Sequence, residues 1–421
     1  MLQNNNNSAV RAQSDSSPIV IWLILLSFFF YQFVARSSFP TVLTEKFMEY
    51  FQLTATGVGA LTSCYYVVYT IMQIPAGIIN DRYEMRWVAT AVSAISALGV
   101  FIFVATSNSY TAGLGQMMIG FGSAFAFSLT LKSIVTWFPA KNVVIMTSFS
   151  ISIGSLGPVI GGPALSRIVK SFDWRSVLEV FALVGLVIAV LAWMKVRSRK
   201  LPASEKSAEI SLLESLKIIT TSPQLWVLSL FTMMIYSPLS ALGDLWGISF
   251  IKKAYGVDAT TAAFMNNMLY VGFIVGTPSF AALATFWNSY KKPMLLAIIS
   301  ATALFCLILS VEVPVNVAFV IFLFLGFSCG AVLAFPLALE IFPPAIGATV
   351  TGFVNMICMM GGVILMSLIG WILDLSWDGA IENDLKVYSL ADYRCALSAV
   401  LVFLVVGIAL ALFIRDKSQK N

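Results

Sequence analysis

Long apolar segments follow one another along most of the chain and are separated by short polar connections. Most of these segments have about 20 residues or more, the length at which a helix crosses a hydrocarbon layer of roughly 30 Å. A helix also satisfies its backbone polar groups internally, as a bilayer requires. We therefore predict an all-α membrane protein with twelve transmembrane helices. The predicted spans are 18–44, 55–79, 86–106, 109–137, 142–169, 174–195, 223–251, 259–285, 293–311, 314–341, 345–373 and 394–414.

One polar stretch divides this pattern into two groups of six helices. Residues 196–222 are rich in Lys, Arg, Ser and Glu, and each group also has a short charged connection after its second helix. Weak internal duplication of this kind is typical of secondary transporters, whose substrate site lies between the halves near the middle of the membrane. The predicted parts are a disordered cytoplasmic tail 1–17, a bundle 18–195, a linker 196–222, a bundle 223–414 and a tail 415–421.

The composition supports a protein that lives in a bilayer. The 421 residues are 59% hydrophobic and 11% charged, more apolar surface than a soluble fold of this size hides. Five cysteines lie in or at the edge of predicted helices, which argues against a disulfide framework. The chain has no histidine, so any coupled proton must use carboxylate, Tyr or Lys chemistry, and we predict no metal or other cofactor.

The basic residues predict the orientation. The connections on one side of the predicted spans contain about twice as many Lys and Arg as those on the other, which places both termini in the cytoplasm of a bacterial-type inner membrane. The net charge of +5 follows from this bias, and no basic stripe with interleaved aromatics indicates a nucleic-acid partner. We expect a small-molecule substrate, the lipid bilayer and a coupling proton as partners, and a monomer.

The charged connection after the second helix reads Gly77-Ile-Ile-Asn-Asp81-Arg82-Tyr-Glu-Met-Arg86. It resembles the corresponding loop of major facilitator superfamily transporters, and the resemblance covers the whole chain. It implies two pseudo-symmetric bundles and a gate in which Asp81, Arg82 and Arg86 form a charge cluster. Glu340, at the inner end of helix ten, is the candidate gate residue of the second half. The alternative is ordinary loop charge that obeys the orientation bias.

A second motif lies in helix five, where Gly154, Gly157, Pro158, Gly161 and Gly162 are similar to the family's glycine-proline pattern. Small residues allow close helix packing, and proline bends a helix. We therefore assign these positions to helix packing.

A third family motif is incomplete. Helix four retains the glycines that follow Gln116, but has this glutamine where many proton symporters have arginine. Proton coupling that depends on that arginine is therefore in doubt.

Arg36 and Asp244 are charged residues well inside the predicted spans, where an unpaired charge costs several kcal/mol. Arg36 lies in helix one, and its planar guanidinium suits a carboxylate or a phosphate. Asp244 lies in the equivalent part of helix seven, after a kink predicted at Pro238 and before Trp246. The two form a substrate site, a gate between the halves or a purely structural pair.

Neutral polar groups complete the candidate substrate site. The spacing of three, four and four residues places Thr62, Tyr65, Tyr69 and Gln73 on one face of helix two, with Tyr66 at its border. Helices eight and eleven offer Asn267 and Asn355. Polar contacts between helices are the alternative explanation of these side chains. The predicted substrate-binding residues are Arg36, Tyr65, Tyr66, Tyr69, Gln73, Asp244, Trp246, Asn267 and Asn355.

These features predict a carrier that moves a small polar organic solute by alternating access. No phosphate loop and no nucleophile with a base points to an enzyme. The stretch from Arg36 through Tyr65 to Pro75 also resembles phagosomal transporters and, distantly, lysosomal dipeptide carriers, so an amino acid or short peptide is the expected substrate. An organic anion (a carboxylate or sugar phosphate), a nucleoside and a non-transporting sensor are the alternatives.

Overall fold

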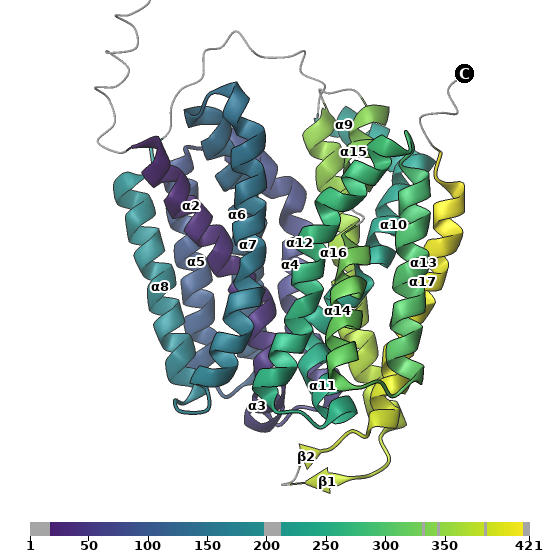
Figure 1. Ribbon diagram of the computed structural model, residues 1–421. Coiled ribbons are helices and arrows are strands. Elements are labelled where there is room, and N and C mark those ends of the chain that lie inside the picture. Colours follow the sequence, from purple (N-terminus) through teal and green to yellow (C-terminus); the bar gives the residue numbers. More distant parts are fainter. Residues whose placement is uncertain (1–16, 198–211, 331–332, 343–345, 383–384, 416–421) are drawn as a thin grey trace, which may run out of the picture.

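The computed structural model describes residues 17–197, 212–330, 333–342, 346–382 and 385–415. Two helical bundles stand side by side, the first drawn in purple to blue and the second in teal to yellow (Figure 1). The predicted tails, apart from Ser17 and Arg415, and most of the predicted linker lie outside the described residues.

The first bundle contains six membrane-length helical segments. Its first segment is continuous through a central π-helical stretch, because α2, η1 and α3 follow one another without a gap. The elements are α2 (Pro18–Phe33), η1 (Val34–Ser38), α3 (Phe39–Phe51), α4 (Ala55–Arg82), α5 (Met85–Ala105), α6 (Ser109–Trp137), α7 (Ala140–Ile168) and α8 (Trp174–Lys195).

The second bundle repeats this plan after the short helix α9 (Leu212–Thr220). Its first segment again has a π-helical stretch, η3, between two α-helices. The elements are α10 (Pro223–Pro238), η3 (Leu239–Trp246), α11 (Gly247–Tyr255), α12 (Ala259–Phe286), α13 (Lys291–Ser310), α14 (Val315–Cys329), α15 (Ala334–Ile341), α16 (Gly347–Ser376), β1 (Ile381–Glu382), β2 (Leu385–Lys386) and α17 (Leu390–Phe413).

The structure confirms the predicted all-α membrane fold. Among the described residues, 11 helical segments are long and apolar enough to cross a membrane, and α4, with 28 residues, takes the second position and completes the twelve. The first segment continues to Phe51, beyond the predicted end at residue 44. The β-hairpin was not predicted: β1 and β2 pair antiparallel, with Ile381 opposite Lys386, in the connection between α16 and α17.

The two ends of the bundles differ in how the halves meet. We call the end where α2 begins and α17 ends the terminal face, and the end with the α3–α4 turn and the β-hairpin the hairpin face (Figure 1). The halves pack together through α4 with α16, α7 with α12, and α3 with η3 and α11. A Cβ atom at Gly59 would overlap the carbonyl oxygen of Met366, so the first of these contacts requires glycine.

Candidate functional site

Both π-helical segments contain a buried charged residue. Arg36 lies in η1 and Asp244 in η3. Pro40 has no N–H to donate to the carbonyl of Arg36, four residues earlier, so the ordinary α-helical bond is missing at that point. Pro238 lies on the other side of its segment, directly before η3, and has no N–H to donate to the carbonyl of Met234 in α10. π-Helical insertions in α-helices are frequent at functional sites, and here the two segments direct the two charges at each other from opposite halves.

Arg36 and Asp244 form the ion pair that the sequence suggested. The guanidinium Nε lies 3.9 Å from Asp244 Oδ1, and the two side chains are 6% and 0% exposed. Arg36 Nη2 also donates to the hydroxyl of Tyr236 at 3.0 Å. The ring of Phe33 lies 4.8 Å from the guanidinium carbon. The pair therefore lies in a closed, largely apolar environment, where each charge depends on its partner.

Two tyrosines hold the carboxylate of Asp244. Tyr66, from the first half, donates to Oδ2 at 2.5 Å, and Tyr270, from the second half, donates to Oδ1 at 2.5 Å. Ser37 shares a 2.6 Å hydrogen bond with the Tyr270 hydroxyl. The carboxylate thus accepts hydrogen bonds on both oxygens, as a buried charge requires.

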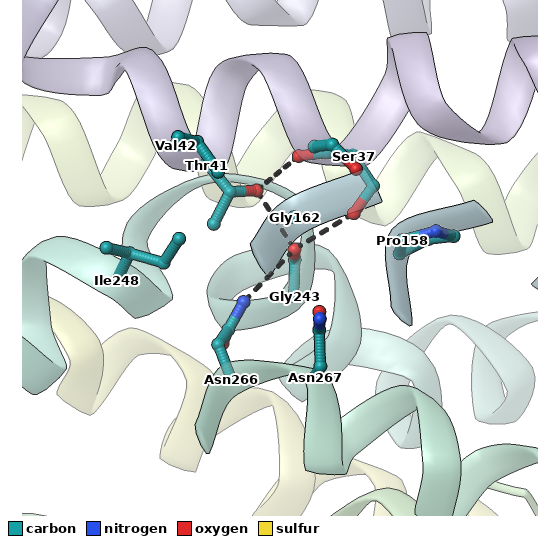
Figure 2. Close-up of a pocket in the computed structure, with 10 residues that line it drawn as sticks. Ser37, Thr41, Val42, Pro158, Gly162, Gly243, Ile248, Asn266 and Asn267 are labelled. Carbon is teal, nitrogen blue, oxygen red and sulfur yellow. Dashed lines mark hydrogen bonds between the residues drawn. The ribbon is translucent and has the colours of Figure 1, made fainter. Parts of the chain in front are cut away.

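A small pocket lies beside this pair, on the side of α3 and α11. The carbonyl of Gly243 accepts hydrogen bonds from Ser37 Oγ at 3.1 Å, Thr41 Oγ1 at 3.0 Å and Asn266 Nδ2 at 3.5 Å (Figure 2). The pocket has a volume of about 10 Å³, enough for one water molecule. The bonds from Ser37 and Thr41 join the halves, and the bond from Ser37 connects the two π-helical segments.

The predicted polar face of α4 extends from the pair toward the terminal face. Tyr65 stacks on Tyr69 with ring centroids 5.7 Å apart, and Asn355 Nδ2 donates to Gln73 Oε1 at 3.0 Å across the halves. Tyr65 and Tyr66 are buried, whereas Tyr69 and Gln73, nearer the terminal face, are partly exposed. The stripe therefore leads from a partly exposed region to the buried charges.

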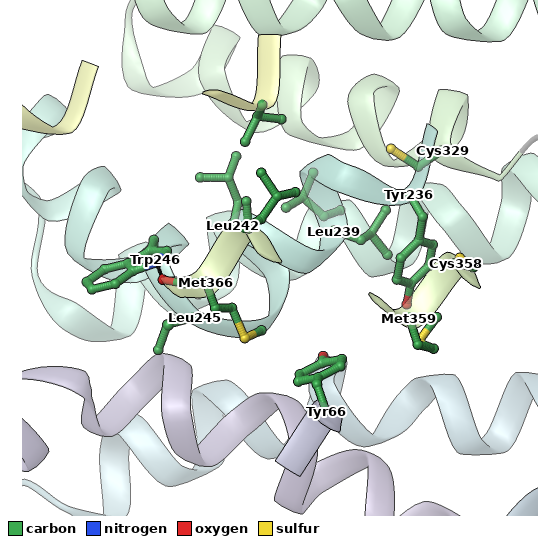
Figure 3. Close-up of a cluster of buried hydrophobic side chains, with 14 of the residues drawn as sticks. Tyr66, Tyr236, Leu239, Leu242, Leu245, Trp246, Cys329, Cys358, Met359 and Met366 are labelled. Carbon is green, nitrogen blue, oxygen red and sulfur yellow. Dashed lines mark hydrogen bonds between the residues drawn. The ribbon is translucent and has the colours of Figure 1, made fainter. Parts of the chain in front are cut away.

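Two other predicted binding residues lie in packing contacts. Trp246 is fully buried among Leu245, Met366 and their neighbours, and its indole N–H donates to the carbonyl of Met366 at 3.4 Å (Figure 3). Asn267 donates to the carbonyl of Val159 at 2.9 Å, between α12 and α7. Their role in substrate binding stays a prediction.

The helix-five motif faces the neighbouring helices closely. A Cβ atom added at any of three of its glycines would lie within 3 Å of a side chain of α2 or η1: Phe29 at Gly154, Phe33 at Gly157 and Ser38 at Gly161. A Cβ at Gly162 would lie 3.4 Å from the Asn267 amide of α12. Pro158 lies within α7 and lines the small pocket.

The predicted gate residues lie near the terminal face. Asp81 and Arg82 end α4, and their side chains lie outside the described part of the structure. The guanidinium of Arg86 lies over the rings of Trp87 and Trp193, with its carbon 5.1 and 5.3 Å from the ring centroids.

In the second half, the Tyr290 hydroxyl donates to Glu340 at 2.8 Å. The gating roles stay predictions.

Sequence reasoning missed Tyr236, Tyr270 and Ser37 as partners of the charged pair. Tyr236 lies eight residues before Asp244, close to two helical turns, so the two side chains lie near the same side of the helix. This spacing could have indicated Tyr236 as a neighbour of the charged pair. Ser37 directly follows Arg36 and acquires its role from the contact with Tyr270. No spacing within the chain indicates this contact, because it joins helices from different halves.

Comparison with known proteins then decides the family. Residues 24–366 match the sequence profile of the Major Facilitator Superfamily. The protein belongs to the Major Facilitator Superfamily. Members are membrane transport proteins rather than enzymes, and they bind small molecules within the membrane, between two bundles such as those described here. Arg36 and Asp244 lie where the halves of such a superfamily protein meet.

Proteins with similar sequences have names that describe different functions. The chain is 24% identical to the "Uncharacterized transporter YybO" of Bacillus subtilis (strain 168), over 80% of this chain and 83% of that protein. It is 24% identical to the "Membrane sensor protein UhpC" of Salmonella typhimurium, over 65% of this chain and 63% of that one. It is 26% identical to the "Probable galactarate/D-glucarate transporter GarP" of Escherichia coli (strain K12), over 45% of this chain and 44% of that one.

A solved structure shows the same fold over nearly the whole length. It is the inward-facing, unoccupied form of a bacterial homologue of the human lysosomal transporter Spinster. The TM-score is 0.75 with 17% sequence identity, over 95% of this chain and 97% of that one.

Proposed function

We propose that this protein is an alternating-access carrier for a small zwitterion, an amino acid or a short peptide. The observation that supports this most directly is the buried ion pair of Arg36 and Asp244 between the halves. The pair has no net charge, and a solute that engages only one member leaves the other buried without a partner. Breaking a buried pair in that way costs about 3–5 kcal/mol.

A zwitterion avoids this cost because it replaces both partners at once. Its carboxylate accepts from the guanidinium of Arg36, and its ammonium donates to Asp244 and takes the place of one of the tyrosine hydroxyls. The bond between Arg36 and Asp244 is long, 3.9 Å, and therefore leaves room for exchange. Tyr69, Gln73 and Asn355 then contact the rest of the solute.

An organic anion with a coupled proton is the second candidate. The relationship to a protein named as a galactarate and glucarate transporter favours it. An anion on Arg36 leaves Asp244 unpaired, and a proton on Asp244 restores neutrality. The two candidates therefore differ in a measurable way: the anion requires a proton for each molecule bound, and the zwitterion does not.

The contacts between the halves indicate which side is open to the solute. The polar bonds around Ser37, Thr41 and Gly243 close the hairpin side of the charged pair. On the polar face of α4, Tyr65 and Tyr66 are buried, whereas Tyr69 and Gln73, closer to the terminal face, are partly exposed. We infer that the substrate enters from the terminal face in this state, and we propose, from the excess of basic residues there, that this face is the cytoplasmic side.

The first test is thermal stabilisation of the detergent-purified protein by amino acids, dipeptides, nucleosides, dicarboxylates and sugar phosphates. A ligand that binds only the folded protein raises the melting temperature, by RT ln(1 + [L]/Kd) in free energy. We expect a shift with zwitterions that disappears in Arg36→Ala. A shift confined to anions, larger at lower pH, supports the anion and proton instead.

Uptake into proteoliposomes separates a carrier from a sensor. The relationship to a named sensor makes this control necessary. We expect saturable uptake of the ligand that stabilises the protein. Binding without any uptake or exchange contradicts the proposal of transport.

A further inference from the structure

The end of α4 at the hairpin face forms hydrogen bonds with side chains of the second half. A helix leaves its first N–H groups without partners inside the helix. Here the N–H of Ala55 donates to the hydroxyl of Tyr388 at 3.0 Å, and the N–H of Thr56 donates to Asp374 Oδ2 at 2.8 Å. Both acceptors belong to the second half, Asp374 to α16 and Tyr388 to the connection before α17.

Asp374 is the centre of this arrangement. Its Oδ1 accepts from the Tyr388 hydroxyl at 2.6 Å and from Lys386 Nζ at 3.1 Å. Its negative charge also faces the positive end of the α4 dipole. Burial and the bond to Asp374 raise the pKa of Tyr388, so the phenol keeps the proton that it donates.

The connection between α16 and α17 holds Lys386 and Tyr388 in place. The indole N–H of Trp377 donates to the carbonyl of Ala380 at 2.9 Å, and Lys386 Nζ lies 4.5 Å from the centroid of the Trp377 ring. The Val387 N–H donates to the Ala380 carbonyl at 3.0 Å, beside the β1–β2 pair. This folding presents both side chains to Asp374.

The helix backbones meet at the same place. A Cβ at Gly370 would overlap the carbonyl oxygen of Ala55, and the Thr56 hydroxyl donates to the carbonyl of Gly370 at 3.3 Å. Alternating access requires these ends of α4 and α16 to separate. Separation would break the hydrogen bonds that Ala55 and Thr56 make with the second half.

We propose that Asp374, Lys386 and Tyr388 form a latch that grips the N-terminus of α4 and holds the protein closed on the hairpin face. The latch lies at the edge of the membrane, where released groups are solvated by water. Its strength therefore sets the equilibrium between the closed and open hairpin face, and the protein still opens. This role does not depend on the identity of the substrate.

The experiment uses a cysteine that is covered only while the hairpin face is closed. Ser63 on α4 is buried and lies 3.0 Å from Ser367 on α16, hydroxyl to hydroxyl. Ser63→Cys is made in the full chain without its five native cysteines, and the labelling rate with a bulky maleimide is measured on purified protein.

The variants are Asp374→Ala and Tyr388→Phe. Asp378→Ala is the matched control, because the hydrogen bond that Asp378 makes to the described residues lies within its own connection, from the Ala380 N–H at 3.1 Å.

We expect Asp374→Ala and Tyr388→Phe to raise the labelling rate roughly tenfold, which corresponds to about 1.4 kcal/mol. Asp378→Ala labels at the parental rate. Parental rates in both latch variants overturn the proposal. If Asp374→Ala does not fold, Tyr388→Phe, which removes one hydroxyl, decides the outcome. No solute is present, so the result is independent of the proposed substrate.

Discussion

At the residue scale, the site is a neutral cluster built from opposite charges. Arg36 and Asp244 are nearly without exposure, and tyrosines from both halves donate to the carboxylate. Sequence alone identified both charges, because a charge inside an apolar span is conspicuous. It did not identify Tyr236, since an isolated tyrosine in a membrane helix has many ordinary explanations.

The charge balance of this cluster predicts how single and double variants differ. Arg36→Ala leaves Asp244 buried without its cation and should destabilise the folded protein by about 3 kcal/mol. Arg36→Ala combined with Asp244→Asn should recover most of that loss, because no net charge remains. Melting temperatures of the purified variants check this. Equal losses in the single and double variants contradict a charge-balanced pair.

Asp244 should also decide whether transport is coupled to protons. If it binds a proton, Asp244→Asn retains exchange of labelled for unlabelled solute but loses uphill accumulation driven by a pH gradient. Exchange and accumulation are both measured in proteoliposomes. Accumulation that persists in Asp244→Asn assigns the coupling to another group.

At the element scale, the spacing of apolar segments predicted the twelve helices, mostly to within a few residues. It did not predict η1 and η3, because a π-helical turn of this length changes the apolar pattern too little. The first helix also extends to Phe51, since its last turns remain packed against the other half through α3 and η3. Prolines marked both π-helical segments, but sequence reasoning interpreted Pro238 only as a kink.

Pro40 lies just after η1, and restoring the backbone donor that it lacks tests the role of η1. Pro40→Ala supplies an N–H for the carbonyl of Arg36, which favours an α-helical turn and rotates Arg36 away from Asp244. We expect affinity for the stabilising ligand to fall about tenfold, the effect of roughly 1.4 kcal/mol, with helix content unchanged. Pro278→Ala, inside α12, is the matched control. Equal affinity in the two variants contradicts a role for η1.

At the scale of the whole molecule, the two bundles meet along α4 with α16 and α7 with α12, while the charged pair lies between them. The latch at Asp374 and the bonds at Gly243 act on the hairpin side of that pair. The resemblance to family loops predicts a second gate, with Asp81 and Arg82, at the terminal face. Alternating access needs control at both faces.

The terminal gate gives a prediction of its own. Asp81→Asn removes the acid of the charge cluster and should reduce transport at least tenfold, while expression and helix content stay at the parental level. Asp173→Asn is a control, because Asp173 bonds the N–H of Arg175 at the opposite face. Uptake and circular dichroism are compared for the three proteins. Full uptake in Asp81→Asn removes Asp81 from the gate.

The sequence by itself determined that this protein lies in a lipid bilayer, where its helices lie along the chain, and which two intramembrane charges are candidates for the site. These follow from the length of the apolar segments and from the cost of a charge in hydrocarbon, which are local properties of the chain. Only the tertiary structure decided that Arg36 meets Asp244, that Tyr66 and Tyr270 hold the carboxylate, and that Asp374 bonds the end of α4. These contacts join residues far apart in the sequence, and their geometry depends on how the two bundles pack. A local sequence pattern does not predict that packing.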